Sequence, residues 1–360
     1  MDLVEKSIEI IRKNQHTSGS FVACPNFKNY NYCWLRDGSF VAHSLDVVND
    51  LNSSSKFFNW VSNVIEKQEE KVNNIIKKVK NNKFISNNDF LPTRFTLEGN
   101  IVGDKWPNFQ LDGYGTWLWA LCEHIKCSGK VELADKYNKS IKITINYLLN
   151  FWNTPNYDCW EENGDKINPT TLSCIYGGLK SISFFINDNK ISDSLKEIKN
   201  YILKRCIVDK RLSKFEGSKS IDSSLLWVTV PFGVFDVRDK VITSTVYEIE
   251  KRLYHSGGVH RYPEDTYYGG GEWPLLSCWL GLYYLEIREI EKAEYILRWV
   301  ENQANVKGEI PEQVLTHTNN CDYIETWKKK WGNVATPLIW SHAMYLIFKE
   351  KFKSIRTVIR

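Results

Sequence analysis

Apolar residues recur at helical spacing along nearly the whole chain, and this periodicity is the feature that most limits its fold. Alternation of the kind that half-buried strands show is scarce. The pattern predicts about twelve helices. They cover the ranges 2–14, 38–51, 56–80, 110–127, 130–151, 169–186, 190–208, 221–230, 241–254, 272–287, 289–304 and 335–352. An all-α protein is therefore expected.

The connections between these helices alternate in length. Those after the second, fourth, sixth and tenth helices are only a few residues long, whereas those after the first, third, fifth, ninth and eleventh have about a dozen to thirty. Short links place neighbouring helices antiparallel. Because the long links of a ring of hairpins all leave from the same end, we expect six helical hairpins that close into an (α/α)6 barrel.

The unusual residues of the sequence gather in the long connections. These hold the stretches YNYCWLRDG, KWPNFQLDG, DCWEENG, HRYPEDTYYGGGEW and GEIPEQV, which are marked by Trp34, Trp106, Trp160, Arg261 and Glu312. The third gap between these markers is about twice the others, and LSKFEGSKS at 212–220 fills it. Because sites concentrate on loops held by a rigid scaffold, we expect an active site in the loops at one end of the barrel.

Composition and charge limit the class of protein. The chain has 360 residues, of which 42% are hydrophobic and 25% charged, the balance of a packed globular protein. A barrel of this length can form one domain, expected here over 1–360. The net charge of +4 lies on Lys-rich faces such as KVNNIIKKVKNNK, without interleaved aromatic residues, so nucleic acid is not an expected partner.

The start of the chain has no signal-peptide core, and no window holds about eighteen uncharged apolar residues. We therefore expect a soluble, cytoplasmic protein with no membrane partner. The nine cysteines include no C-x-x-C pair, which favours reduced and mostly buried thiols. The sequence does not indicate an oligomeric state.

Aromatic rings beside hydrogen-bonding charged groups are typical of a sugar site. The faces of a pyranose ring pack on Trp or Tyr, and Arg, Asp, Glu and Gln hold its hydroxyls. Cleavage of a glycosidic bond further needs two carboxyl groups, one that donates a proton and one that activates water or attacks the sugar. Glu161, which follows Trp160 in YDCWEENGDK, and Glu312, from a loop across the ring, supply this pair.

Each of these motifs also has a structural explanation. Glu161 and Glu162 could be a solvated pair near a helix start, where carboxylates suit the helix dipole. Glu312 follows Pro311 and could belong to the first turn of a helix. The WLRDG stretch could hold an ion pair between Arg36 and Asp37. Independent capping would have scattered such residues, however, and here they map to one face.

Five motifs give the chain a strong resemblance to a known family. YNYCWLRDG, DCWEENG, RYPEDTYY, PEQV and TPLIWSHA match, in order, the signature stretches of glycoside hydrolase family 15, the family of the glucoamylases. The resemblance implies an (α/α)6 barrel and exo-acting hydrolysis with inversion. It implies release of β-D-glucose from the non-reducing ends of malto-oligosaccharides or small α-glucosides, without a metal or cofactor.

The resemblance also assigns roles. Glu161 matches the general acid of the family, and Glu312 matches its general base. The other matching or neighbouring residues are expected to bind substrate: Tyr30 and Trp340 near the base and its water; Arg36, Asp37, Glu162 and Arg261 on the non-reducing glucose; Trp106 and Gln110 over the acid; Trp34 and Trp160 beside them; and Trp273 toward the acceptor.

Some features depart from the family pattern. We expect neither the β-sandwich that precedes the barrel in many prokaryotic members nor a starch-binding module, which favours a small disaccharide or oligosaccharide over granular starch. Glycines precede Trp273, which leaves the acceptor contacts open. A specificity for isomaltose or trehalose stays an alternative.

Other classes of function find less support. A non-catalytic sugar-binding protein has no need of both Glu161 and Glu312. The seven histidines show neither H-x-x-x-H nor H-E-x-x-H, and His255 and His260 stand alone in a loop, so no metal is predicted. Gly269 to Gly271 lack the spacing of a phosphate-binding loop.

Overall fold

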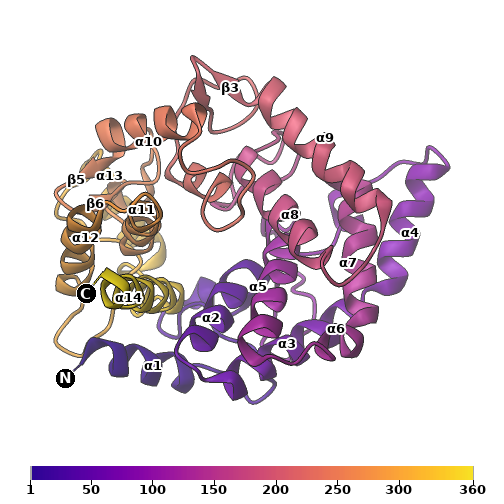
Figure 1. Cartoon of the computed structure of the whole chain (residues 1–360), viewed down its shortest axis with the longest axis horizontal. Coiled ribbons are helices and arrows are strands. Elements are labelled where there is room, and N and C mark those ends of the chain that lie inside the picture. Colours follow the sequence, from indigo (N-terminus) through magenta and orange to yellow (C-terminus); the bar gives the residue numbers. More distant parts are fainter. Residues whose placement is uncertain (1, 360) are drawn as a thin grey trace.

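The computed structural model describes residues 2–359. Its centre is a ring of six elements: α2 (Leu35–Val47), α5 (Asp112–Ser128), α8 (Pro169–Ile182), η3 (Ser223–Val228), α11 (Pro274–Glu286) and α14 (Ile339–Ile359). Each contacts the next, and α14 contacts α2, so that the ring is closed (Figure 1). The predicted (α/α)6 barrel is therefore confirmed.

A second layer of helices surrounds this ring. It consists of α1 (Leu3–Lys13), α3 (Leu51–Glu66), α7 (Asn138–Phe151), α9 (Asn189–Arg205), α10 (Lys240–Leu253) and α12 (Ile290–Asn302). Each packs against at least one inner element, and α1 packs on α14 (Figure 1). The short links predicted from the sequence join α2 to α3, α8 to α9 and α11 to α12. Inner and outer helices thus form the antiparallel hairpins that short links require.

Burial explains why the two layers differ in sequence. The inner helix α11 reads PLLSCWLGLYYLE and is buried over nearly its whole length, whereas α12 buries only Ala293, Ile296, Leu297 and Val300 on one side. Helices α5 and α8 approach closely enough that a Cβ at Gly115 would collide with the backbone carbonyl of Cys174. All nine cysteines are free, and seven of them are buried.

The helix boundaries differ from the predicted ones in several places. The segment predicted over 130–151 holds the short α6 (Leu133–Lys136) before α7, and the helix predicted over 335–352 is α14, which covers Ile339–Ile359. The segment predicted as one helix over 56–80 is two, α3 and α4 (Glu69–Lys80), and α4 turns to pack on α7. The segment predicted over 221–230 is the 3-10 helix η3, which ends shortly before Pro231. The helix predicted over 38–51 begins at Leu35, so Arg36 and Asp37 lie in its first turn.

The long connections contain further short elements. These are α6 (Leu133–Lys136), α13 (Asp322–Trp331), η1 (Lys28–Tyr30), η2 (Asn87–Asp89), η4 (Tyr267–Gly269) and three antiparallel two-residue pairs: β1 (Cys33–Trp34) with β2 (Arg94–Phe95), β3 (Ile207–Val208) with β4 (Arg211–Leu212), and β5 (Tyr254–His255) with β6 (Gly258–Val259). Helix α13 was not predicted, because the whole segment reads as a loop between two stronger patterns.

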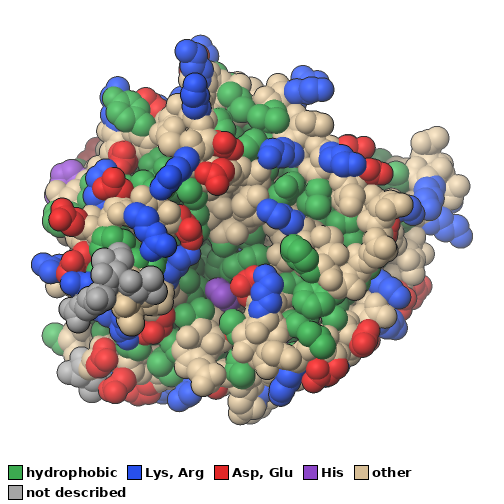
Figure 2. Space-filling model, viewed as in Figure 1, with side chains coloured by type: hydrophobic (Ala, Val, Ile, Leu, Met, Phe, Trp, Pro, Cys, Tyr) green, Lys and Arg blue, Asp and Glu red, His purple; other side chains and the backbone are tan. Residues whose placement is uncertain are grey.

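Cavities occupy both ends of the ring. The larger, about 1030 Å³, is lined by Phe40, Trp227 and other residues toward the C-terminal ends of the inner helices. Figure 2 shows a central hollow with hydrophobic side chains on the face toward the viewer. Phe40 and Trp227 both pack on Trp340, which lines the cavity at the other end, so a layer of aromatic rings separates the two.

Within the described residues, no helix combines the length and the apolar character needed to cross a lipid bilayer.

Candidate active site

The cavity at the N-terminal ends of the inner helices has a volume of about 410 Å³. All the residues predicted for the site line it except Gln110, which lies behind its wall: Tyr30, Trp34, Arg36, Asp37, Trp106, Trp160, Glu161, Glu162, Arg261, Trp273, Glu312 and Trp340. The long connections therefore bring the predicted residues together at one end of the barrel.

A tight turn positions Glu161. Asp158 Oδ1 accepts hydrogen bonds from the backbone N–H of Trp160 (3.0 Å) and of Glu162 (2.9 Å), and its Oδ2 accepts from Asn163 Nδ2 (2.9 Å). Glu161 itself adopts a left-handed conformation, with φ of 68°. A non-glycine residue holds this conformation only where its surroundings enforce it. Asp158 thus fixes the direction in which the Glu161 side chain leaves the backbone.

Two donors hold one oxygen of Glu161. Trp34 Nε1 donates to Oε1 over 2.6 Å, and Gln110 Nε2 donates to the same atom over 3.2 Å. The amide of Gln110 is fixed in turn, because its Oε1 accepts from Arg36 (2.9 Å). Within the described residues, Glu161 Oε2 takes no hydrogen bond, which leaves this oxygen available to a ligand in the cavity.

Glu312 lies in a drier environment. Its side chain is 2% exposed, its Oε1 accepts from the Tyr30 hydroxyl over 2.8 Å, and its buried Oε2 has no protein partner among the described residues. Burial raises the pKa of Glu312 to about 7, although the hydrogen bond from Tyr30 and the charge of Arg261 act in the opposite direction. Glu312 can therefore exchange a proton near neutral pH.

Two buried arginines bring positive charge to the cavity. Arg36 bonds Asp112 Oδ2 over 2.9 Å and lies 3.3 Å from Asp37 Oδ2, and burial raises the pKa of Asp37 to about 6. Arg261 makes a bidentate pair with Asp265, over 2.7 and 2.5 Å. Such pairs hold a guanidinium rigidly while its remaining donors stay available to a ligand.

Glu162 lines the same cavity but is held by different residues. Both its oxygens accept from the Tyr262 hydroxyl, over 2.8 and 2.6 Å, and Arg261 and Lys214 lie 3.7 Å away. Its side chain is 37% exposed. Although Glu161 and Glu162 are adjacent in the sequence, their side chains belong to separate hydrogen-bond networks.

Comparison with known proteins identifies the family. The family model described as glycosyl hydrolases family 15 matches residues 2–349. The chain belongs to this family.

Its relatives agree with this assignment. This family 15 glycoside hydrolase is 37% identical over 357 residues to an isomaltose glucohydrolase of Kribbella flavida, covering 97% of the chain and 92% of the relative. A glycosidase variant solved in complex with glucose superposes with a TM-score of 0.93 at 36% identity, covering 98% and 96% of the two chains. The glucoamylase of Saccharomycopsis fibuligera shares the fold, with a TM-score of 0.77 at 14% identity, over 98% and 95%.

Several residues of the cavity in this family 15 enzyme were not predicted. Trp327 and Trp331 come from α13, Tyr262, Asp265 and Tyr267 from the loop after Arg261, and Lys105 and Pro107 flank Trp106. Tyr267 and Tyr262 lie within the RYPEDTYY motif, so the motif itself was the available signal. The tryptophans of α13 lie outside the family motifs, although acidic residues at the start of DYIETWKKKW and lysines at its end could have indicated the helix.

Trp160 has a hydrogen-bond partner that the sequence did not predict. Its ring lines the cavity, but its Nε1 donates to both oxygens of Asp222, over 3.1 and 3.0 Å. Lys214 of the LSKFEGSKS stretch lies 3.4 Å from the same carboxylate. The connection between α9 and η3 of this family 15 enzyme thus reaches the site through Lys214 and Asp222, as the place of LSKFEGSKS in the spacing suggested.

Proposed function

We propose that this family 15 enzyme is an exo-acting, inverting α-glucosidase that releases β-D-glucose from the non-reducing end of small α-glucosides, with isomaltose as its best substrate. The observation that carries the proposal is the pair of glutamates in one cavity, each with one oxygen free of protein partners. Hydrolysis of a glycoside needs this pair in two different protonation states.

In the proposed mechanism, Glu161 is the general acid. Trp34 and Gln110 fix its Oε1, so its Oε2 is the oxygen that would carry a proton to the glycosidic oxygen. Glu312 is the general base. Tyr30 fixes its Oε1, and Oε2 would take the proton of the water that attacks the anomeric carbon. The proton that leaves with the aglycone is thus restored to the enzyme from that water.

The charged groups beside this pair suit the hydroxyls of a single glucose. Asp37 Oδ2 is buried and takes no hydrogen bond from protein in the described part of the chain, and Glu162 is partly open to the cavity. Arg36 and Arg261 supply donors on either side. Carboxylates and guanidinium groups together can pair with each neighbouring hydroxyl of a pyranose as donor or acceptor.

The choice of isomaltose rests on the named activity of the Kribbella relative and on the size of the cavity. A volume of about 410 Å³ is within the usual range for a small-molecule site. Malto-oligosaccharides and trehalose are the competing substrates, because neither the linkage nor the acceptor is fixed by the residues that would hold the first glucose.

A substrate panel tests the proposal. Isomaltose, maltose, trehalose, isomaltotriose and maltotriose are incubated with the enzyme, and free glucose and shortened products are quantified with time. Isomaltose should show the highest kcat/KM, and each trisaccharide that is cleaved should yield glucose and a disaccharide. The Glu161→Gln variant, assayed in the same way, measures any glucose that does not come from catalysis by the enzyme. A tenfold preference for maltose or trehalose would overturn the proposed linkage, and absence of glucose release from every sugar would overturn the function.

A further inference from the structure

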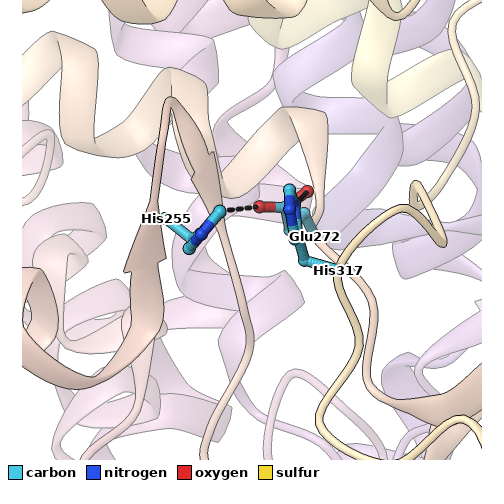
Figure 3. A group of neighbouring side chains, drawn as sticks. All are labelled: His255, Glu272 and His317. Atoms are coloured by element: carbon cyan, nitrogen blue, oxygen red, sulfur yellow. Dashed lines mark hydrogen bonds and ion pairs between the residues drawn. The ribbon is translucent and has the colours of Figure 1, made fainter.

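Outside the residues that line the catalytic cavity, three potential metal ligands meet: His255, Glu272 and His317 (Figure 3). His317 Nδ1 lies 3.3 Å from Glu272 Oε2, and His255 Nδ1 lies 3.6 Å from Glu272 Oε1. One ligand atom of each residue lies within 4.8 Å of the others. His255 and Glu272 lie 17 residues apart in the connection between α10 and α11, and His317 lies in the connection after α12, so no sequence spacing indicated them.

Glu272 is a buried carboxylate with too few partners. It is 1% exposed, and its Oε1 has no hydrogen bond in the described structure. Among the described residues, only the two histidines come within 4.0 Å of it as basic groups. A buried carboxylate is costly unless it is paired or bound to a metal ion. The Glu272 carboxylate therefore needs a positive charge at this point.

Gly258 makes room for this carboxylate. A Cβ at Gly258 would collide with the carboxyl group of Glu272. The hairpin β5–β6 thus closes directly over Glu272, and it carries His255 at its first strand. The two histidines are half-exposed, at 50% and 46% of their side chains, so their rings can turn and water can reach the group.

We propose that His255, Glu272 and His317 bind one Zn²⁺ ion. Two imidazole nitrogens and one carboxylate are a common protein ligand set for zinc, with bonds of about 2.0–2.2 Å and water in the remaining position. Ligands at that bond length around a tetrahedral ion lie about 3.3–3.5 Å apart. In the structure, one such atom from each residue lies within 4.8 Å of the others, so the half-exposed imidazole rings would turn inward to close around one ion. Oxygen-selective cations such as Mg²⁺ and Ca²⁺ fit a site with two imidazoles poorly.

The ion would join three segments that border the catalytic cavity. Glu272 precedes Trp273 and exchanges two backbone hydrogen bonds with Val314, over 3.0 and 2.7 Å. Val314 lies two residues after Glu312 and three before His317. Trp273 N–H donates to Val259 of the hairpin over 2.8 Å. Zinc would therefore hold together the hairpin, the start of α11 and the loop that bears Glu312, without contacting the substrate.

Titration of the full chain, without an affinity tag and freed of metal by chelation, tests the site. Isothermal titration with ZnCl₂ should find one ion per chain, and the melting temperature should rise with zinc concentration because the ion binds only the folded state. His255→Ala and His317→Ala should each weaken zinc binding by at least about tenfold. MgCl₂ and CaCl₂ should give no comparable heat.

His16→Ala is the matched control. His16 is also exposed and lies 3.8 Å from a glutamate, Glu98, but the group contains no second histidine. This variant should bind zinc as the unaltered chain does. The proposal is overturned if the unaltered chain takes up no zinc, or if the His255→Ala, His317→Ala double variant binds it as tightly as His16→Ala. Because the two histidines lie outside the cavity, both single variants should keep the hydrolytic kcat, which separates this test from that of the proposed function.

Discussion

At the scale of residues, Glu161 and Glu312 are held by different kinds of neighbour. Glu161 is half-buried and has two nitrogen donors on one oxygen, whereas Glu312 is buried against tyrosine hydroxyls. Two carboxyl groups in unlike environments are what acid and base roles in one reaction require. The roles proposed for the two glutamates come from the family motifs that contain them, and they can be tested on each residue alone.

Replacing either glutamate should stop the reaction while the sugar still binds. Glu161→Gln and Glu312→Gln should each lower kcat by about 10²–10⁴-fold, because each removes a proton transfer that is used only in the transition state. The control Glu162→Gln keeps both transfers and should mainly raise KM, since we propose that Glu162, which lines the same cavity, binds sugar hydroxyls. Steady-state kinetics on the best substrate measures both effects. Near-normal turnover of Glu161→Gln or Glu312→Gln would place the chemistry elsewhere.

The burial of Glu312 predicts the acid side of the pH profile. A general base must be ionised, and the pKa of Glu312 is raised to about 7. The value of kcat/KM should therefore rise as the pH increases through about 7 and fall below it. Tyr30→Phe removes a hydrogen bond that lowers this pKa, so the acid limb should move to higher pH in that variant. An unshifted limb would show that Glu312 does not set it.

The sequence motifs predicted most of the residues that line the cavity, because each motif holds several of these residues in one short stretch. Glu161, Arg261 and Glu312 were found in this way. Lys214 and Asp222 were not, since their roles depend on how a distant connection folds over Trp160. Asp158 is another example: nothing in DCWEENG distinguishes the residue that builds the turn from one that binds sugar.

At the scale of elements, α13 completes the wall of the cavity. Its Trp331 stacks on Trp106 with ring centroids 6.5 Å apart and meets Tyr267 edge-on at 5.8 Å. Trp327 lies beside it, at 4.9 Å. The helix thus adds two rings to the wall of the cavity that holds the two glutamates, and we expect them to contact the second sugar of a disaccharide.

Removing one of these rings should weaken binding more than turnover. Trp331→Ala should raise KM by about tenfold with little change in kcat, because the aromatic wall contacts ground state and transition state alike. Trp152→Ala, a partly buried tryptophan that packs on Tyr201, is the matched control and should keep KM. An unchanged KM in Trp331→Ala would mean that α13 does not contact the substrate.

The contact between α5 and α8 depends on glycine. Gly115→Ala should lower the free energy of unfolding by about 1–3 kcal/mol, because the new methyl group would press on the Cys174 carbonyl and force two inner helices apart. Gly103→Ala is the control, since a Cβ there meets no atom within 4 Å. Thermal unfolding followed by circular dichroism measures both. Equal stability of the two variants would contradict the tight approach of these helices.

The presence of a helix was easier to predict from the sequence than its type (α or 3-10) or the residues at which it begins and ends. Long periodic segments such as α5 and α11 were found, whereas the apolar run over 221–230 forms a 3-10 helix of the inner ring. Periodicity over so short a run cannot separate the two helix types. The sequence contains no proline or glycine at the break between α3 and α4. The break instead depends on the packing of α4 on α7, which the sequence pattern does not show.

At the scale of the whole molecule, the acid and the base belong to connections on different parts of the ring. Glu161 precedes α8, and Glu312 lies between α12 and α14. Carboxyl groups held by separate hairpins can stand about 6.5–9.5 Å apart, which leaves room for a water molecule, whereas about 5 Å favours direct attack on the sugar. We propose the wider separation and hence inversion, as the family resemblance implies.

The first anomer released tests this directly. An α-linked substrate should yield β-glucose in the opening minutes, visible by proton NMR before mutarotation mixes the anomers. Authentic α-glucose, added under the same conditions, measures the rate of mutarotation. Initial release of α-glucose would require a covalent glycosyl-enzyme and would contradict the role of Glu312 as a base that acts through water.

The contact of α14 with α2 also has a consequence for how the protein is made. During synthesis, α2 is made early and α14 is made late. The apolar side chains of α2 that pack on α14 therefore stay uncovered until nearly all of the described residues have been made. Contacts between residues so distant in sequence form slowly, and the apolar surface that they will bury is prone to aggregation until they form. Because Trp340 belongs to α14 and lines the candidate active site, the nascent chain cannot complete this cavity before α14 has been made.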